Sequence, residues 1–254
     1  MTLPIIKPLS LLVAAIFLGS APVLAEELTE EDNSDQWRFE LKPLYLWFLS
    51  MEGDTTIPSP ERDSGSTSNF DEGKLTSAFS LHFEAGKGDW TVFTDYLYGQ
   101  YTADNINISS SPIQGNSELT MHLAELGVTY RVLEDFWYRV ELLGGVRYMY
   151  VENKFDFYSD KLDSLSAKDS LWDGFGGIRL KGFLNDSISA TVRADVGGGS
   201  SDLVWNVTAL VDWRYLNWGS AYAGYRVLDY KVSNEALGLN LQAKGPVIGL
   251  NFYW

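Results

Sequence analysis

The feature that most constrains this fold is a strict alternation of apolar and polar side chains along extended runs of the chain. In 203–215 every odd-numbered residue is apolar, and in 188–196 every even-numbered residue is apolar. The run 138–150 follows the same rule, with Gly144 as its one small member. Successive side chains of a β-strand point to opposite faces of the sheet. This period of two therefore predicts strands with one apolar and one polar face.

Ten such runs follow one another along the chain, joined by connections that alternate between short and long. The predicted strands are 37–50, 73–87, 90–103, 117–131, 137–152, 168–183, 187–198, 202–215, 218–232 and 239–254. Tight turns are expected at Gly88-Asp89, Glu134-Asp135, Asn185-Asp186 and around Asn217. Longer polar loops are expected at 51–72, 104–116, 153–167 and 233–238, with a short exception near Gly199–Ser201. Alternating loop lengths and an even strand count predict an all-β, up-and-down antiparallel barrel with short periplasmic turns and long extracellular loops.

The first residues have the pattern of an export signal. Lys7 supplies a positive start, Leu11–Leu18 a short apolar stretch, and Val23–Ala25 a small-residue cleavage site. The apolar stretch is shorter than the roughly 20 residues that a membrane-spanning helix requires. We therefore predict a cleaved signal peptide at 1–25, an acidic flexible leader at 26–36 and a barrel domain at 37–254.

Composition excludes several classes of function. The formal net charge of −15 disfavours nucleic acid, whose phosphates require a basic surface. The chain has no cysteine, which excludes disulfides, thiolate metal sites and cysteine catalysis. The mean hydropathy of −0.11 is compatible with a membrane barrel, because only alternate residues of each strand face lipid.

Four observations predict that the apolar faces look outward at lipid: aromatic residues near the ends of these faces, many glycines on the polar faces, near-balanced charge on the polar faces, and a last strand that ends in Trp254. The polar-face glycines include Gly86, Gly99, Gly127, Gly145, Gly177, Gly197 and Gly224. The ten polar-face cations are Arg38, Lys42, Arg131, Arg139, Arg147, Arg179, Lys181, Arg193, Arg214 and Arg226, and the eight anions are Glu40, Glu84, Asp95, Glu125, Glu141, Asp173, Asp195 and Asp212. A soluble periplasmic β-protein is the alternative, because it shows the same alternation.

The last predicted strand contains one irregularity. Leu241 and Ala243 lie in one phase of the alternation, whereas Ile248 and Leu250 lie in the other. Since Gly245-Pro246 separates the two groups, we expect a β-bulge or kink at this position.

Several short motifs together are similar to a family of bacterial outer-membrane β-barrel proteins that are mostly uncharacterised or described as porin-like. They are Leu171-Trp172-Asp173, Arg193-Ala194-Asp195-Val196-Gly197-Gly198, Ser201-Asp202-Leu203-Val204-Trp205, Gly224-Tyr225-Arg226, Gly245-Pro246-Val247-Ile248-Gly249-Leu250, and the opening Pro43-Leu44-Tyr45-Leu46-Trp47 with Gly53-Asp54. The resemblance implies a barrel in the bacterial outer membrane and no particular substrate. Trp254 departs from it, because the family usually ends in Phe.

Opposite charges two residues apart point to the same side of a strand and predict a charge network inside the barrel. Its predicted members are Arg139, Glu141, Arg147, Asp173, Arg179, Arg193, Asp195, Asp212, Arg214 and Arg226. Such a network acts either as a charged constriction that selects solutes or as a salt-bridged plug. About eight strands enclose a lumen that side chains just fill, and water-filled porins have about 16. Ten strands therefore favour the plug.

Histidine is the side chain best suited to acid–base chemistry near neutral pH, and the chain has two. His82 shares a polar face with Glu84, a pair that suits proton transfer or metal binding but is more often simple packing. His122 lies on the opposite phase to Glu125. We expect no catalytic residue, cofactor or metal site, and so no enzyme.

The leading functional prediction is a non-enzymatic outer-membrane barrel that is structural or gives narrow passage to small solutes or ions. The alternatives are surface adhesion or ligand binding through 51–72 and 153–167, and, less favoured, an outer-membrane hydrolase. Acids such as Glu61, Asp63, Asp71 and Glu72 suit divalent cations that bridge lipopolysaccharide, although such charges are usually only solvated. The expected partners are outer-membrane lipids with lipopolysaccharide, and the barrel-assembly machinery through the C-terminal strand.

Overall fold

The computed structural model describes residues 36–43, 46–47, 50–57, 66–69, 74–107, 114–157, 165–233 and 238–254. The predicted signal peptide, the predicted leader up to residue 35, and the loop acids Glu61, Asp63, Asp71 and Glu72 lie outside these ranges. Within the described part of the chain, no helix has the length and apolar character to cross a membrane.

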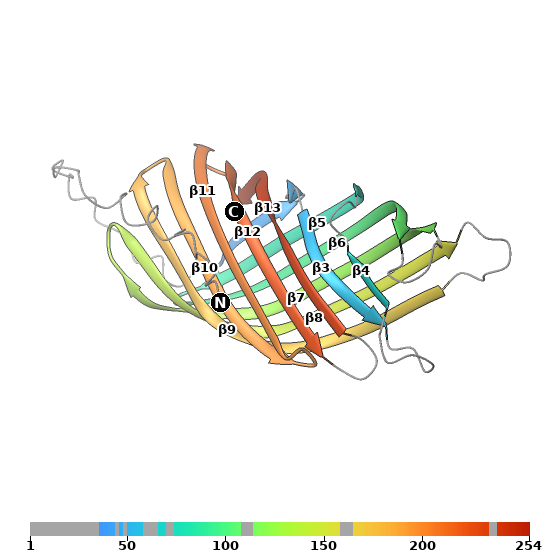
Figure 1. Cartoon of the computed structure of the whole chain (residues 1–254). Coiled ribbons are helices and arrows are strands. Elements are labelled where there is room, and N and C mark those ends of the chain that lie inside the picture. The colour runs from blue at the N-terminus through green and yellow to red at the C-terminus, as the bar shows by residue number, and fades with distance from the viewer. Residues whose placement is uncertain are drawn as a thin grey trace, which may run out of the picture. The chain divides into compact units, whose positions relative to one another are not determined.

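The described residues are almost entirely strand (Figure 1). The strands are β1 Arg38–Pro43, β2 Leu46–Trp47, β3 Ser50–Ile57, β4 Ser66–Asn69, β5 Lys74–Lys87, β6 Trp90–Asn107, β7 Gln114–Glu134, β8 Tyr138–Phe157, β9 Leu165–Asn185, β10 Ile188–Gly199, β11 Leu203–Leu216, β12 Gly219–Ser233 and β13 Gly238–Tyr253. β1, β2 and β3 pair one after another with the same neighbour, β13, and together form the first wall segment of the barrel. β4 pairs with β3 and β5 pairs with β1, so β4 and β5 together form the second wall segment. The result is a ten-stranded barrel, which confirms the predicted strand count.

Antiparallel pairing runs without interruption around the sheet and closes it. β5 to β13 pair in sequence order, and β1 joins β13 through Glu40 opposite Tyr253 and Leu41 opposite Phe252. A closed barrel leaves no sheet edge within the membrane, where unpaired backbone groups are costly. We assign the end with the tight turns to the periplasm and the opposite end to the extracellular side, because outer-membrane barrels usually have short periplasmic turns and long extracellular loops.

The predicted bulge at Gly245-Pro246 is wrong. Gly245 pairs with Arg226 and Pro246 with Tyr225 in an unbroken register between β12 and β13. The register against β13 shifts instead in the first wall segment, between Leu41 opposite Phe252 and Leu46 opposite Ile248.

The strands extend further toward the extracellular end than the sequence predicted. β7 and β9 have 21 residues each and β8 has 20, and they include residues that were expected in loops 104–116 and 153–167. β4 and all of β3 after its first residue likewise lie within the expected loop 51–72. Since about 9–11 residues suffice to cross a membrane, these strands continue well beyond it.

Side-chain burial inverts along the length of a strand. On β7, Leu126 and Val128 point outward and are exposed, whereas Leu119, Met121 and Leu123 point into the lumen and are buried. β13 repeats the pattern, with Leu250 outward near one end and Leu241 inward near the other. The two phases of β13 therefore reflect a change of surroundings along a regular strand.

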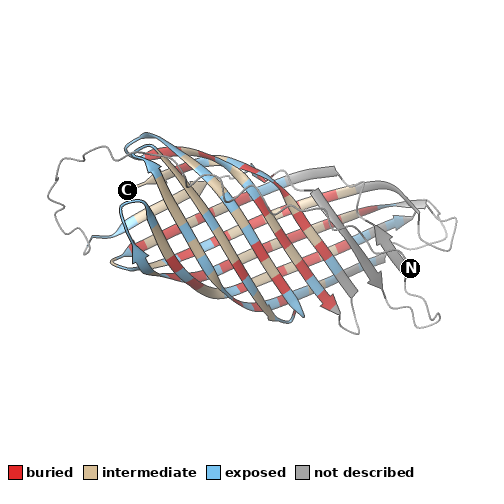
Figure 2. Cartoon of the chain, turned by 60° about the vertical axis from the view of Figure 1, so that its left-hand side comes forward, coloured by how far each residue is buried: buried red, intermediate tan, exposed pale blue. Residues whose placement is uncertain are grey.

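The barrel consequently has two zones. In the transmembrane zone, between the tight turns and the level of Glu125, the outer face is apolar and the lumen polar. In the extracellular extension, beyond that level, outer positions such as Thr120 and Lys154 are polar and the lumen holds an apolar cluster. Figure 2 shows buried and exposed residues alternating along the strands of both zones. The apolar cluster consists of Trp47, Leu97, Tyr101, Leu119, Met121, Leu123, Met149, Val151, Leu171, Val204, Tyr222, Leu228, Tyr230, Val232, Leu241, Ala243 and Val247. Two of these residues, Tyr222 and Val247, lie on the tight-turn side of the Glu125 level and connect the cluster to the transmembrane zone.

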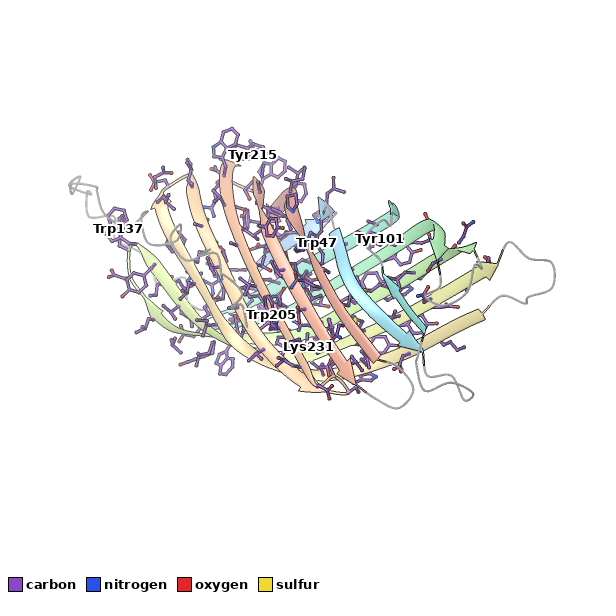
Figure 3. The ribbon with its side chains drawn as sticks, in the orientation of Figure 1. Trp47, Tyr101, Trp137, Trp205, Tyr215 and Lys231 are labelled. Carbon is purple, nitrogen blue, oxygen red and sulfur yellow. The ribbon has the colours of Figure 1, made fainter. Side chains whose placement is uncertain are left out.

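Aromatic residues border the apolar outer face at both ends. Near the tight turns, Trp137 and Tyr215 point away from the barrel (Figure 3). At the upper border, His122 packs between Tyr98 and Tyr150, with ring centroids 5.0 and 5.8 Å apart, and its Nδ1 lies 2.9 Å from the Tyr96 hydroxyl. Aromatic girdles of this kind mark the two interfaces of a membrane. The sequence had placed His122 on this outer phase.

Candidate functional site: an ion-pair network across the lumen

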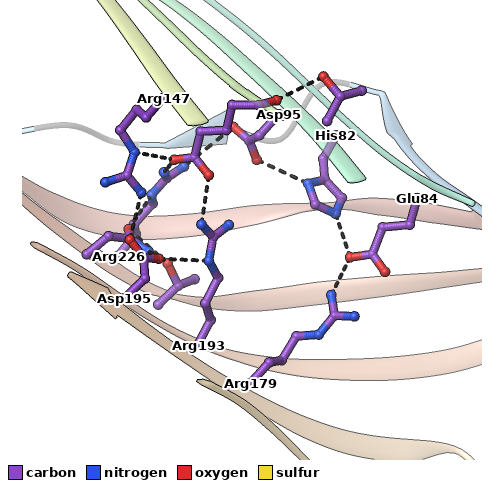
Figure 4. A network of polar contacts seen from close by, with 12 residues as sticks. His82, Glu84, Asp95, Arg147, Arg179, Arg193, Asp195 and Arg226 are labelled. Carbon is purple, nitrogen blue, oxygen red and sulfur yellow. Dashed lines mark hydrogen bonds and ion pairs between the residues drawn. The ribbon is translucent and has the colours of Figure 1, made fainter. Parts of the chain in front are cut away.

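The centre of the lumen is occupied by Glu125 and the arginines around it. Glu125 lies on β7 directly opposite Arg147 on β8, and both side chains are completely buried. One carboxylate oxygen, Oε1, lies 2.9 Å from Arg147 Nε and 3.4 Å from Arg226 Nη2, and the other, Oε2, lies 2.8 Å from Arg193 Nη2. A single carboxylate therefore serves three guanidinium groups from three different strands (Figure 4).

Asp195 on β10 completes this central cluster. Its Oδ1 accepts a hydrogen bond from Arg147 at 2.7 Å, and its Oδ2 accepts one from Arg193 at 2.9 Å. Asn206 of β11 donates to the same Oδ2 at 2.9 Å and accepts from Arg226 Nε at 3.0 Å. Charge-assisted hydrogen bonds of this kind are stronger and more directional than neutral ones.

A second cluster lies on the periplasmic side of the first. Arg179 of β9 forms ion pairs with Glu84 of β5 and Glu141 of β8. Its Nη2 also donates to the Thr129 hydroxyl at 3.4 Å. Arg179 therefore links β9 to β5 across the lumen, because these strands are four places apart in the ten-stranded wall.

His82 connects the two clusters. Its Nδ1 lies 3.1 Å from Asp95 and its Nε2 lies 2.9 Å from Glu84. Asp95 in turn lies 3.7 Å from Arg226 of the central cluster. Two carboxylate acceptors on one imidazole are satisfied together when both ring nitrogens carry protons. The linked contacts involve residues of eight strands, β5 to β12.

Aromatic rings support the guanidinium groups from the side. Arg147 lies 4.8 Å from the Phe175 ring, Arg193 lies 5.1 Å from the Phe93 ring, and Arg226 lies 5.0 Å from the Trp47 ring. Cation–π contacts of this kind gain strength away from water.

Glycines make room for these rings. Gly127 and Gly145 lie opposite each other on β7 and β8. A Cβ on Gly127 would lie 2.4 Å from the Phe93 ring, and one on Gly145 would lie 2.9 Å from the Phe175 ring. The lumen glycines noted in the sequence therefore admit the aromatic side of the ion-pair network.

The structure brings together six of the ten residues predicted for the lumen network. Arg147, Arg193, Asp195 and Arg226 belong to the central cluster, and Glu141 and Arg179 belong to the second. The remaining four have other partners. Asp173 accepts hydrogen bonds from the Ser201 backbone and hydroxyl, Asp212 accepts them from Ser220 and Tyr253, Arg214 lies over the Tyr253 ring, and Arg139 pairs with Glu134.

Sequence reasoning missed the central position of Glu125 and the linking role of His82. Both had been placed on polar faces, together with Glu84 and Asp95. The partners of Glu125 are 22 to 101 residues away in sequence, and the Asp95 partner of His82 is 13 residues away. The spacing of two residues predicts only local contacts, such as His82 with Glu84 and Arg193 with Asp195. The absence of Asn206 from the predicted network has the same cause.

Two cavities lie on the periplasmic side of the central cluster. The inner one, of about 90 Å³, is lined by His82, Arg193 and Arg226 among others. The outer one, of about 170 Å³, is lined by Arg139, Lys181 and Asp212 among others. Lys42, Arg179 and Tyr222 border both cavities. On the extracellular side of the central cluster, the side chains of the apolar cluster pack in the lumen.

The network provides little that resembles a reactive centre. Both ring nitrogens of His82 are engaged by carboxylates, so the imidazole has no nitrogen free to activate a nucleophile. Among the described residues, no group of three or more His, Asp or Glu side chains is arranged to hold a metal ion.

No protein-family model and no curated protein matches this sequence. Several solved structures resemble the fold. The outer-membrane protease OmpT of Escherichia coli is 10% identical, with a TM-score of 0.52, over 87% of this chain and 97% of that one. The translocator domain of the autotransporter NalP of Neisseria meningitidis is 14% identical, with a TM-score of 0.46, over 87% and 89%. Ail of Yersinia pestis is 10% identical, with a TM-score of 0.37, over 85% and 97%.

At 10% identity, the match to OmpT establishes the fold alone. The closed ten-stranded barrel, its apolar outer face and its two aromatic borders agree with that fold. The chain is thus a β-barrel of the bacterial outer membrane.

Proposed function

We propose that this protein is a non-enzymatic, structural barrel of the outer membrane whose lumen is closed at rest. The observation that carries this proposal is the stacking of two sealing layers. The central cluster contains Glu125 and Arg147 side chains that are 0% exposed, and the apolar cluster fills the lumen beyond them.

The two layers oppose passage for different physical reasons. An ion or polar solute moving through the central cluster must break charge-assisted hydrogen bonds that bind neighbouring strands to one another. Beyond it, the solute loses its hydration among Leu123, Met149 and Leu228, which offer no charged or strongly polar partner. Of the two sequence-based alternatives, plug and constriction, this geometry favours the plug.

Planar-bilayer recording tests the proposal. We expect the purified barrel to give no reproducible openings under conditions in which a water-filled porin conducts. Regular wild-type openings whose ion selectivity changes on Arg193→Gln or Asp195→Asn would instead identify a narrow channel and overturn the proposal.

Surface binding is a second candidate, and the length of β7, β8 and β9 favours it. These strands carry a folded, water-facing surface beyond the membrane, with Glu118, Glu152, Lys154 and Lys168 in it or at its edge. If this surface binds an external ligand, cells producing a Lys154→Glu/Lys168→Glu variant should adhere to host-cell monolayers differently from cells producing the wild type. Equal adherence at equal surface levels would count against it.

A hydrolase is a third candidate, because the fold is shared with a protease. The engaged nitrogens of His82 and its position beneath the apolar cluster weigh against this role. Peptide turnover that is lost on His82→Ala would establish it.

We also propose that the last strand is recognised by the barrel-assembly machinery and that lipopolysaccharide surrounds the extracellular border. Trp254 is 61% exposed and stacks on Phe39 at 5.7 Å, so it is available at the end of β13. Trp254→Ser should lower the amount of barrel in the outer membrane. An unchanged amount would exclude this signal.

A further inference from the structure

The outer lumen cavity has no role in the two layers that close the lumen. It lies on the periplasmic side of the ion-pair network and encloses about 170 Å³, far more than the roughly 10–15 Å³ that a single water needs. A further cavity of about 360 Å³ adjoins it toward Trp137 and the periplasmic turns. Lys181 and Asp212 line both cavities, so they stand where the two meet.

Most charged groups around the outer cavity are already neutralised. Lys42 pairs with Glu40, and Arg179 pairs with Glu84 and Glu141. These contacts use three of the four carboxylates that line the cavity. The fourth, Asp212, accepts hydrogen bonds from the Ser220 hydroxyl at 2.9 Å and from the Tyr253 hydroxyl at 3.3 Å.

Lys181 is the exception. Its ammonium lies over the Phe183 ring, 5.7 Å from the centroid, and has no carboxylate within ion-pair distance among the described residues. On the neighbouring strand it faces Arg139, another cation. Like charges directly opposite each other on paired strands are destabilising. Arg139 pairs with Glu134 at the rim, which moderates this repulsion but supplies no carboxylate partner to Lys181.

Arg38 increases the positive character of the same cavity. Its guanidinium donates to the Gly88 carbonyl oxygen at 2.8 Å and has no carboxylate partner within the described part of the chain. The cavity therefore combines an ammonium and a guanidinium that lack counter-charges with space for several non-hydrogen atoms. A small anion would supply the missing counter-charge and replace part of the solvation that Lys181 loses.

We propose that this cavity is a periplasm-facing binding site for a small oxyanion, a phosphate or carboxylate group, with Lys181 as its main ligand. The site is blind, because the central cluster and the apolar cluster close its far end. It therefore binds its ligand from the periplasm without passing it across the membrane.

Isothermal titration of the refolded barrel with inorganic phosphate, and separately with succinate, tests the proposal and distinguishes the two oxyanion types. Saturable binding of at least one is expected at low salt. A second readout locates it: the ligand should slow acylation of the Lys181 amine by an amine-reactive reagent, as measured by mass spectrometry of the digested protein.

Three variants define the outcome. Lys181→Met keeps most of the aliphatic stem but removes the charge, and it should weaken binding at least tenfold. Asp212→Asn removes a negative charge from the same cavity and should tighten binding. Lys168→Met, on the outer face of the extension, should leave the affinity unchanged.

Lys181→Met and Asp212→Asn are expected to change the affinity in opposite directions, so a folding defect in one variant does not decide the test. Should Lys181→Met fail to refold, Asp212→Asn still decides, because equal or weaker binding by that variant would overturn the proposal. Wild-type affinity in Lys181→Met, an equal loss in Lys168→Met, or no saturable binding of either anion would also overturn it.

Discussion

Glu125 is the residue on which the lumen electrostatics converge. Its two oxygens face Arg147, Arg193 and Arg226 where its side chain has no contact with solvent. Buried ion pairs add little net stability compared with apolar packing, but removing one partner leaves uncompensated charge and is costly. Gly127 and Gly145 also contribute to this cluster, because the absence of a side chain at each leaves room for an aromatic ring that contacts an arginine.

Glu125→Gln should therefore lower the free energy of unfolding by about 3–5 kcal/mol, the usual cost of breaking a buried pair from one side. Glutamine keeps the shape of the side chain but leaves three guanidinium groups around a neutral amide. Urea unfolding in lipid vesicles, followed by tryptophan fluorescence, measures the change. Glu152→Gln is the control, because its ion pair with Lys154 at 3.5 Å lies where water screens it, and this substitution should leave stability nearly unchanged. Equal effects of the two substitutions would refute the buried network.

Adjacent glycines on β9 provide a second prediction. A Cβ on Gly177 would lie 2.1 Å from the Ala194 carbonyl oxygen, whereas one on Gly176 would meet nothing nearer than 3.8 Å. Gly177→Ala should therefore reduce refolding yield or stability, because backbone must move to accept the methyl group. Gly176→Ala, on the outer face, should be tolerated. The fraction of heat-modifiable barrel on cold gel electrophoresis compares the two, and equal yields would contradict the close approach at Gly177.

At the scale of the element, period-two alternation located the ten strands and the tight turns, because both depend on neighbouring residues. Alternation did not reveal that β7 and β13 keep a regular phase while their apolar face changes from outward to inward. For this reason the sequence pattern at Leu241 and Ala243 wrongly predicts a bulge. The alternation shows only which face of a strand is apolar. That face points outward where lipid surrounds the barrel and inward where water surrounds it.

The two zones predict opposite responses to the same charge on one strand. Leu126 and Thr120 both point outward on β7, but Leu126 lies in the transmembrane zone and Thr120 in the extension. Leu126→Lys should cost about 2–4 kcal/mol if it lies near the bilayer midplane, as for other lipid-facing lysines. Thr120→Lys should cost close to nothing, because water surrounds it. Unfolding titrations in vesicles measure both, and a similar penalty at the two positions would show that the membrane border is misplaced.

At the scale of the whole molecule, the contacts that matter most join distant parts of the chain. Arg226 meets Glu125 across 101 residues, and Arg179 meets Glu84 across 95. The sequence showed that these residues share polar faces, and closure of the barrel decides which of them meet. For this reason a charged lumen was predictable, whereas its division into a charged layer and an apolar layer was not.

The extracellular extension should behave as a folded body with its own core, as a soluble β-protein does. Met149 is 0% exposed within the apolar cluster, and truncating such a side chain usually costs 2–5 kcal/mol. If the extension opens separately from the transmembrane zone, Met149→Ala should weaken hydrogen-exchange protection at 117–123 and 149–153 while that at 126–131 and 138–146 is retained. The wild-type barrel in micelles should protect all four segments, because their residues, apart from Arg131 and Tyr138 beside the tight turn, are paired on both sides within the sheet. Uniform loss across both zones would show that the barrel unfolds as one unit, and unprotected amides in the wild-type extension would show that its core does not hold in water.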